Sequence, residues 1–281
     1  MQTCFNRHGV VIFFMVGVLV GSGLYARRCE AGASPPRKGP CPSHLEADRS
    51  GEENLEPSAN VVVTESIGTA WPLACGYLVT NNHVVSGAES ITLIDQTGRG
   101  FHAWPVLLDE LHDIAFLEVA DAQDLPPALP LANSRSAIDT RVFTVGFPAE
   151  GMSTQGPKRS QGRICGLNGT REDDASYRTT VPVRHGNSGG PLMNLSGEVV
   201  GVVRSMLAYQ DKGSNRTYIL ENASCAVKAA AVKALLEHLP EKTKTRRTLA
   251  KPSGSEEALY HAVAHSVLQV VARRYENEAA E

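Results

Sequence analysis

Residues 184–194 have the sequence RHGNSGGPLMN, a glycine-rich turn in which Ser188 is the one hydroxyl side chain. Glycines at Gly186, Gly189 and Gly190 allow backbone angles that other residues resist, and they let a substrate approach the chain closely. A serine is a weak nucleophile unless a base removes its proton during the attack. If Ser188 is a nucleophile, the rest of the chain must therefore supply a base and a group that orients it.

Two stretches upstream of this turn contain candidates for these groups. Residues 76–85, GYLVTNNHVV, form an apolar, β-rich run that includes His83, and residues 112–119, HDIAFLEV, place Asp113 before a second such run. The order His, Asp, Ser along the chain is that of chymotrypsin and differs from the orders in subtilisin and the α/β-hydrolases. We therefore predict a catalytic triad in which Ser188 is the nucleophile, His83 the general base and Asp113 the orienting acid.

The three stretches also carry a family resemblance, which covers about residues 60–240. The blocks TNNHVV, DIAFL and GNSGGPL resemble the signature motifs of trypsin-like serine peptidases of the HtrA (Deg) type. The resemblance implies a chymotrypsin-like fold and hydrolysis of peptide bonds in unfolded proteins, without a metal or cofactor. It also implies an oxyanion hole made by the backbone N–H groups of Gly186 and Ser188, with Asn187 shaping the turn.

The same resemblance predicts the residues of a substrate pocket on both sides of the nucleophile turn. They are Val183 before the turn and Val203, Arg204 and Ser205 after it. The valines predict a shallow apolar pocket for small aliphatic side chains. A small polar residue is usual in the family where this chain has Arg204. Arg204 either faces the triad aspartate or the pocket rim, where it would favour acidic substrates, or it points into solvent.

The pattern of short strands predicts an all-β fold. Runs rich in Val, Ile and Thr recur between turn-forming residues, a spacing typical of antiparallel barrels or sandwiches. The Pro-rich joint at 125–131 divides these runs into two groups. We therefore predict two six-stranded antiparallel β-barrels, at about 59–131 and 132–222, with the active site in the cleft between them. The predicted strands are 60–65, 76–80, 90–94, 105–108, 114–119, 141–146, 162–166, 177–181, 191–193, 198–206 and 217–220.

Two helices are predicted after the strands. Residues 223–239 are Ala-rich with apolar residues at helical spacing, so we expect a helix that closes the second barrel and ends before Pro240. In the tail, 241–281, a basic linker precedes the capping-box motif of residues 253–256. That motif predicts an amphipathic helix that reaches about Tyr275, and we expect this tail to be separate from the protease domain at 59–240.

The tail suggests neither a metal site nor a further domain. His261 and His265 lie one helical turn apart, a spacing that can bind zinc, but the glutamate of the H-E-x-x-H motif is missing. We therefore assign no metal ligands. Many HtrA proteins carry a PDZ module after the protease domain, and 241–281 is too short for one, so we expect none.

The first residues predict export. Residues 9–26 form an uncharged apolar run, so 1–26 is either a secretory signal peptide or an uncleaved signal anchor. Residues 27–58 are rich in Pro, Gly, Ser and charge, and we expect a flexible linker. A formal net charge of −3 gives no strong field that would attract nucleic acid. The six cysteines predict no specific disulfide.

The sequence therefore favours a secreted or membrane-anchored serine endopeptidase that acts on polypeptides, and a homo-oligomer is compatible with it. One alternative is a catalytically silent binding protein that keeps the protease fold. Another is an enzyme whose loops order only when a partner docks, with the predicted helix at about 255–275 as the regulatory contact.

Overall fold

The computed structural model describes residues 61–148, 156–169, 173–211, 216–242, 246–250 and 255–277. The strands are β1 Val61–Pro72, β2 Leu78–Thr80, β3 Ser90–Ile94, β4 Gly100–Asp109, β5 Ile114–Val119, β6 Arg141–Gly146, β7 Lys158–Gly166, β8 Ser176–Thr179, β9 Pro191–Asn194, β10 Val199–Asp211, β11 Arg216–Lys228 and β12 Leu268–Asn277. The helices are α1 Asn82–Val85, α2 Ala229–Leu236 and α3 Glu256–Ala264. The predicted signal or anchor segment 1–26 and the predicted linker 27–58 lie outside these ranges.

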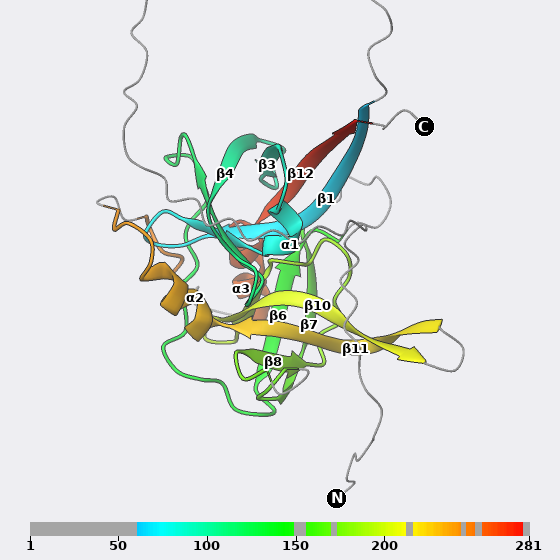
Figure 1. The fold of residues 1–281 in the computed structure, drawn as a ribbon. Helices are drawn as coiled ribbons and strands as arrows, with labels where there is room; N and C mark the ends of the chain where they lie inside the picture. The colour runs from blue at the N-terminus through cyan, green and yellow to red at the C-terminus, as the bar shows by residue number, and fades with distance from the viewer. Residues whose placement is uncertain are drawn as a thin grey trace, which may run out of the picture.

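The strands form two closed six-stranded barrels, one above the other in Figure 1. Barrel 1 has the strand order β1-β12-β3-β4-β5-β2, and barrel 2 has the order β10-β11-β8-β7-β6-β9. All pairs within the two barrels are antiparallel. The predicted all-β class and the two six-stranded barrels are therefore confirmed. Each strand predicted between residues 60 and 220 corresponds to one of β1 to β11, because turn residues bound every β-rich run.

The separate helical tail is the main error of the sequence prediction. The helix α3 ends at Ala264, and residues 268–277 are the strand β12. This strand pairs with β1 from Val61↔Asn277 to Ala70↔Leu268, and its other edge pairs with β3. The buried side chains of Leu268, Val270 and Ala272 alternate along it and enter the interior of barrel 1. The spacing of the apolar residues in this segment is compatible with a helix and with a strand. The segment forms a strand because β1 and β3 offer backbone hydrogen bonds to it in the barrel.

The position of β12 in barrel 1 follows from a comparison of the two barrels. In barrel 2 the first strand in sequence pairs with the second and fourth, and the third pairs with the sixth. Barrel 1 obeys the same scheme when β12 is counted as its first strand and β1 as its second. Figure 1 shows β1 and β12 side by side. β12, the last strand of the described residues, therefore occupies the first-strand position of barrel 1.

The closing helix is shorter than predicted. Residues 223–228 of the predicted helix belong to β11, where Ser224 to Val227 pair with β8. The helix α2 begins at Ala229 and its last residue is Leu236. Alanine-rich residues are compatible with a helix, but the ladder of barrel 2 supplies hydrogen bonds that an isolated turn of helix lacks.

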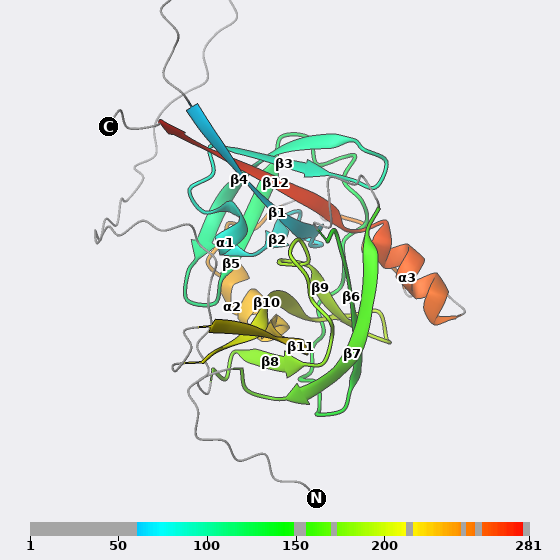
Figure 2. The same cartoon turned by 90° about the vertical axis from the view of Figure 1, so that its right-hand side faces the viewer.

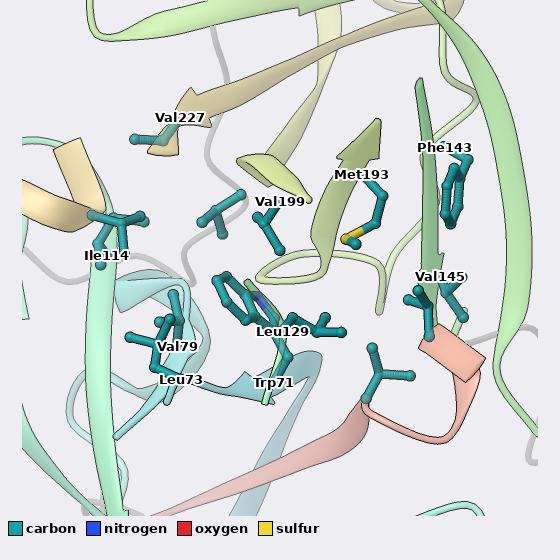
Figure 3. Packing of buried hydrophobic residues seen from close by; sticks show 14 of the residues in the cluster. Trp71, Leu73, Val79, Ile114, Leu129, Phe143, Val145, Met193, Val199 and Val227 are labelled. Carbon is teal, nitrogen blue, oxygen red and sulfur yellow. The ribbon is translucent and has the colours of Figure 1, made fainter. Parts of the chain in front are cut away.

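A shared hydrophobic core joins the two barrels. Trp71 from β1 and Leu129 from the joint between the barrels lie at its centre, and both are fully buried. In Figure 3, Ile114 of barrel 1 lies on one side of them, with Phe143 and Met193 of barrel 2 on the other. Each barrel also has a core of its own. The shared core fixes how the barrels sit against each other, and so where residues from both can meet.

Within the described ranges, no helix is both long and apolar enough to cross a membrane.

Candidate active site

His83 and Asp113 are held together by two hydrogen bonds at one end of barrel 1. The Nδ1 atom of His83 lies 2.7 Å from Oδ2 of Asp113, and the backbone N–H of His83 donates to Oδ1 at 2.9 Å. An ionised carboxylate only accepts hydrogen bonds, so the ionised form of Asp113 pairs with the His83 tautomer that carries its proton on Nδ1 and leaves Nε2 as an acceptor. This is the tautomer that a general base requires.

The backbone at Asp113 is strained and is supported by its neighbours. Asp113 has a φ angle of 59°, in the left-handed region that residues other than glycine rarely adopt, and is 3% exposed. Its carbonyl oxygen accepts hydrogen bonds from the Asn81 side-chain amide at 2.8 Å and from the Asn82 N–H at 3.3 Å. Such strain persists only where surrounding contacts impose it, and it is concentrated at functional sites.

Ser188 lies in a sharp turn of barrel 2. The N–H of Asn187 donates to the carbonyl oxygen of Arg184 at 3.0 Å and closes a four-residue turn. Gly186, the third residue of that turn, has a φ angle of 91°, which is characteristic of a type II turn and suits glycine. Gly189, directly after the serine, has a φ angle of 84°. Two of the predicted turn glycines thus adopt angles that an L side chain resists.

The nucleophile turn is anchored on β1 of the other barrel. The N–H of Thr69 donates to the Ser188 carbonyl oxygen at 2.8 Å, and the Thr69 hydroxyl donates to the Gly186 carbonyl oxygen at 2.7 Å. The indole N–H of Trp71 donates to the Gly189 carbonyl oxygen at 3.1 Å. These bonds engage three carbonyl groups of the turn. The N–H groups of Gly186 and Ser188, in contrast, donate to no acceptor in the described part of the chain.

Arg204 connects the two barrels at the site. The Ser188 hydroxyl donates a long hydrogen bond of 3.4 Å to the Arg204 carbonyl oxygen. The Arg204 side chain is 16% exposed, and its Nε lies 3.6 Å from the Asp113 Oδ2 atom that also contacts His83. A second carboxylate, that of Asp173, lies 3.7 Å from the other side of the guanidinium. Arg204 faces the predicted triad aspartate, so the alternative that points it into solvent is wrong.

The predicted pocket residues have different surroundings. The side chains of Val183 and Val203 are 8% and 1% exposed and pack within the core of barrel 2. The side chain of Ser205 lies outside the described part of the structure. A cavity of about 310 Å³ lies beside α3, and its lining includes none of the predicted site residues.

Sequence reasoning missed Thr69 and Trp71, the two residues of β1 that anchor the nucleophile turn. Their acceptors are backbone oxygens that lie 117 and 118 residues away in the sequence. No local motif marks such a residue, because the acceptor carries no side-chain identity. Arg274 of β12, whose guanidinium donates to the Ser86 carbonyl oxygen 188 residues away, was missed for the same reason.

Comparisons with known proteins identify the family of the chain. Residues 61–202 match the family model described as a trypsin-like peptidase domain. The chain is 38% identical over 130 residues to the serine endoprotease DegS of Salmonella typhimurium. This alignment covers 45% of this chain and 36% of that protein. It is 37% identical over 139 residues to the periplasmic serine endoprotease DegP of Salmonella typhimurium, which covers 48% of this chain and 28% of that protein.

A solved structure of the serine endoprotease from Yersinia pestis is similar in fold. Its TM-score is 0.51 with 28% sequence identity, and the match covers 63% of this chain and 61% of that one. The alignments thus span about a third of the length of the curated relatives. The DegS and DegP matches confirm the resemblance to the HtrA (Deg) type. Because the family model covers half of the sequence and includes His83, Asp113 and Ser188, the chain belongs to the trypsin-like peptidase domain family.

Proposed function

We propose that the protein is a serine endopeptidase that hydrolyses peptide bonds with Ser188, His83 and Asp113 as its catalytic triad. The observation that carries this proposal is the pairing of His83 Nδ1 with Asp113 Oδ2 at 2.7 Å, beside a nucleophile turn that β1 holds by its carbonyl groups. The names of the relatives, which are serine endoproteases, support the same reaction.

In the proposed reaction, His83 transfers one proton in each step. The Ser188 oxygen forms a bond to the peptide carbonyl carbon while His83 Nε2 accepts the hydroxyl proton, and His83 then donates this proton to the leaving amine. Asp113 stays ionised throughout and stabilises the imidazolium ion. The hydrogen bond from Ser188 to the Arg204 carbonyl oxygen is long, at 3.4 Å, so the hydroxyl gives it up at little cost. Water then cleaves the acyl-enzyme by the same route.

The oxyanion hole consists, in this proposal, of the N–H groups of Gly186 and Ser188. Both groups lack an acceptor within the described residues, whereas the carbonyl groups of the same turn are engaged by β1. Such donors stabilise charge that appears only in the transition state, and the loss of one donor costs about 10²- to 10³-fold in kcat. Asn187 sets the turn through its bond to Arg184.

We further propose that the substrates are extended segments of unfolded polypeptide with a small aliphatic side chain before the cut. This preference rests on the family resemblance alone, because Val183 and Val203 pack within the core of barrel 2. The Arg204 guanidinium lies between the carboxylates of Asp113 and Asp173, which compensate its charge, so we do not propose an acidic preference. A cleavage-site profile of a digested proteome tests the pocket: Val or Ala before the cut supports it, and Glu or Asp overturns it.

Export is part of the proposal and rests on the apolar run at 9–26, together with the word periplasmic in the name of one relative. Fractionation of cells that express the full chain and a form lacking 1–26 separates a cleaved signal from a retained anchor. Size-exclusion chromatography with light scattering tests for a homo-oligomer.

Labelling with a fluorophosphonate, followed by digestion of unfolded casein, tests the reaction directly. We expect the protein to be labelled and to cleave casein, and Ser188→Ala to lose both activities. Ser196→Ala is the matched control, because Ser196 lies in an exposed turn after β9. If the folded wild-type protein is neither labelled nor active, the alternative of a silent binding protein with this fold is favoured.

A further inference from the structure

The last strand of the described chain completes the barrel that carries His83. β12 is hydrogen-bonded on one side to β1 and on the other to β3, in the position that an earlier strand occupies in barrel 2. Barrel 1, which positions His83, therefore closes only with residues of β12, which lie about 190 positions later in the sequence. Without β12, the facing edges of β1 and β3 would lose their backbone partners, which is costly for buried strands.

Arg274 of β12 contacts the short helix that contains His83. Its guanidinium donates to the Ser86 carbonyl oxygen from Nε at 2.9 Å and from Nη2 at 2.6 Å, and to the Val84 carbonyl oxygen at 3.3 Å. A further bond joins Nη1 to the Ser66 hydroxyl at 2.7 Å. The last carbonyl groups of a helix have no partner within the helix, so a cationic donor there stabilises the end of α1.

The segment 255–277, which contains α3 and β12, also contacts barrel 2. In α3, Glu256 forms two hydrogen bonds with Arg141 of β6, at 2.8 and 2.9 Å. The Tyr260 ring packs edge-on against Phe143, with ring centroids 4.5 Å apart, and its hydroxyl donates to the Gln161 side chain at 3.1 Å. Figure 2 shows α3 beside β6 and β7, with β12 leading from it into barrel 1. Residues 255–277 thus join the two barrels whose side chains must meet at the site.

We propose that residues 255–277 are an assembly element of the active site and that Arg274 is a positioning residue for His83. Docking of β12 closes barrel 1, and Arg274 then fixes the end of α1 so that His83 Nδ1 meets Asp113. A chain in which this segment has not docked is an inactive precursor. The proposal rests on the proposed peptidase function for its activity readouts, but its structural core is the geometry of the His83–Asp113 pair.

Arg274→Ala and Arg273→Ala form a matched pair of variants on one strand. Arg273 is 47% exposed and pairs with Glu65 at 2.7 Å on the outer surface, whereas Arg274 faces α1. The protein is labelled with ¹⁵N in its histidine side chains and observed by NMR. The proton on His83 Nδ1, hydrogen-bonded to Asp113, gives a signal at low field. We expect this signal in the wild type and in Arg273→Ala, and its loss in Arg274→Ala.

Kinetics of the same variants give a second readout. We expect Arg274→Ala to lower kcat by about 10²-fold with little change in KM, because a displaced catalytic group slows the chemical step more than it weakens binding. Arg274→Lys should recover part of this loss, since an ammonium group can still donate to the Ser86 carbonyl oxygen. A folded Arg274→Ala protein that keeps both the low-field signal and the wild-type kcat overturns the positioning role.

Cleavage of the full chain tests the assembly role. A site for a specific protease is placed in residues 251–254, between Ala250 and the start of α3, and the folded protein is cut there. We expect the cut protein to keep the low-field signal and its labelling at Ser188, to lose both when the fragment is removed in mild urea, and to regain both with a synthetic 255–277 peptide. Retention of both after removal overturns the proposal.

The two proposals fail in different ways. If the wild type shows the low-field signal but no labelling or cleavage, the peptidase function fails and the NMR comparison of Arg274→Ala with Arg273→Ala still decides the positioning role. If labelling is normal in the wild type and unchanged in Arg274→Ala and in the protein without its fragment, the peptidase function stands and this inference fails.

Discussion

Gly189 combines a left-handed backbone with close contact to the opposite barrel. A Cβ atom at this position would lie 2.3 Å from the Thr69 carbonyl oxygen and 2.4 Å from the Thr80 hydroxyl. Gly98 has nearly the same φ angle, 87° against 84°, but a Cβ there would meet nothing within 4 Å. The two glycines therefore separate the cost of the backbone angle from the cost of the contact.

We expect Gly98→Ala to destabilise the protein by about 1 kcal/mol, the cost of a left-handed angle, and to leave activity unchanged. Gly189→Ala should cost several kcal/mol more and abolish fluorophosphonate labelling, because the nucleophile turn can no longer dock on β1. Urea unfolding and labelling measure the two effects. Similar losses in both variants would show that contact with β1 is unimportant.

Arg204 is a partly buried cation between two carboxylates. We expect Arg204→Gln to destabilise the protein by about 1–3 kcal/mol, because the carboxylate of Asp113, 4% exposed, loses a compensating charge. Arg163→Gln is the control, since its ion pair with Asp139 is 50% and 77% exposed and should contribute less than about 1 kcal/mol. Urea unfolding at neutral pH compares the two, and equal losses would contradict an electrostatic role for Arg204.

At the scale of elements, Tyr260 is one of the buried side chains that hold α3 on barrel 2. The side chain is 6% exposed, packs on Phe143 and lies under the Arg159 guanidinium at 3.7 Å from the ring centroid. Tyr260→Ala removes this packing and should cost about 3–5 kcal/mol, whereas Tyr260→Phe loses only the hydrogen bond to Gln161 and should cost about 1 kcal/mol. Urea unfolding measures the stability of both variants. A large loss of stability in Tyr260→Phe would mean that the hydrogen bond of the hydroxyl, and not the packing of the ring, holds α3.

The elements also show where periodicity misleads. Residues 267–272 contain apolar side chains at i and i+3, as a helix requires, and at alternate positions, as a strand requires. A short apolar segment cannot distinguish the two. The neighbours β1 and β3 offer hydrogen bonds to an extended chain only, and they decide the outcome.

For the whole molecule, the shared core predicts that the two barrels unfold together. Leu129 is fully buried between them, and its N–H donates to the Pro72 carbonyl oxygen at 2.9 Å. Leu129→Ala should cost about 2–5 kcal/mol. Hydrogen exchange should show the same loss of protection in β3 of barrel 1 and in β9 of barrel 2. Loss of protection in one barrel alone would mean that the barrels are independent folding units.

The amino-acid sequence by itself predicted the presence of the strands from β1 to β11 and the two-barrel class, and it supplied the three residues of the proposed triad. Alternating β-branched runs between turn residues mark strands locally, and the residues around His83, Asp113 and Ser188 form short motifs that resemble those of a known family. Only the tertiary structure decided that β12 completes barrel 1, that β1 anchors the nucleophile turn and that Arg204 faces Asp113. These features depend on contacts between backbone groups and charges that are far apart in the sequence, and no local sequence pattern specifies such contacts.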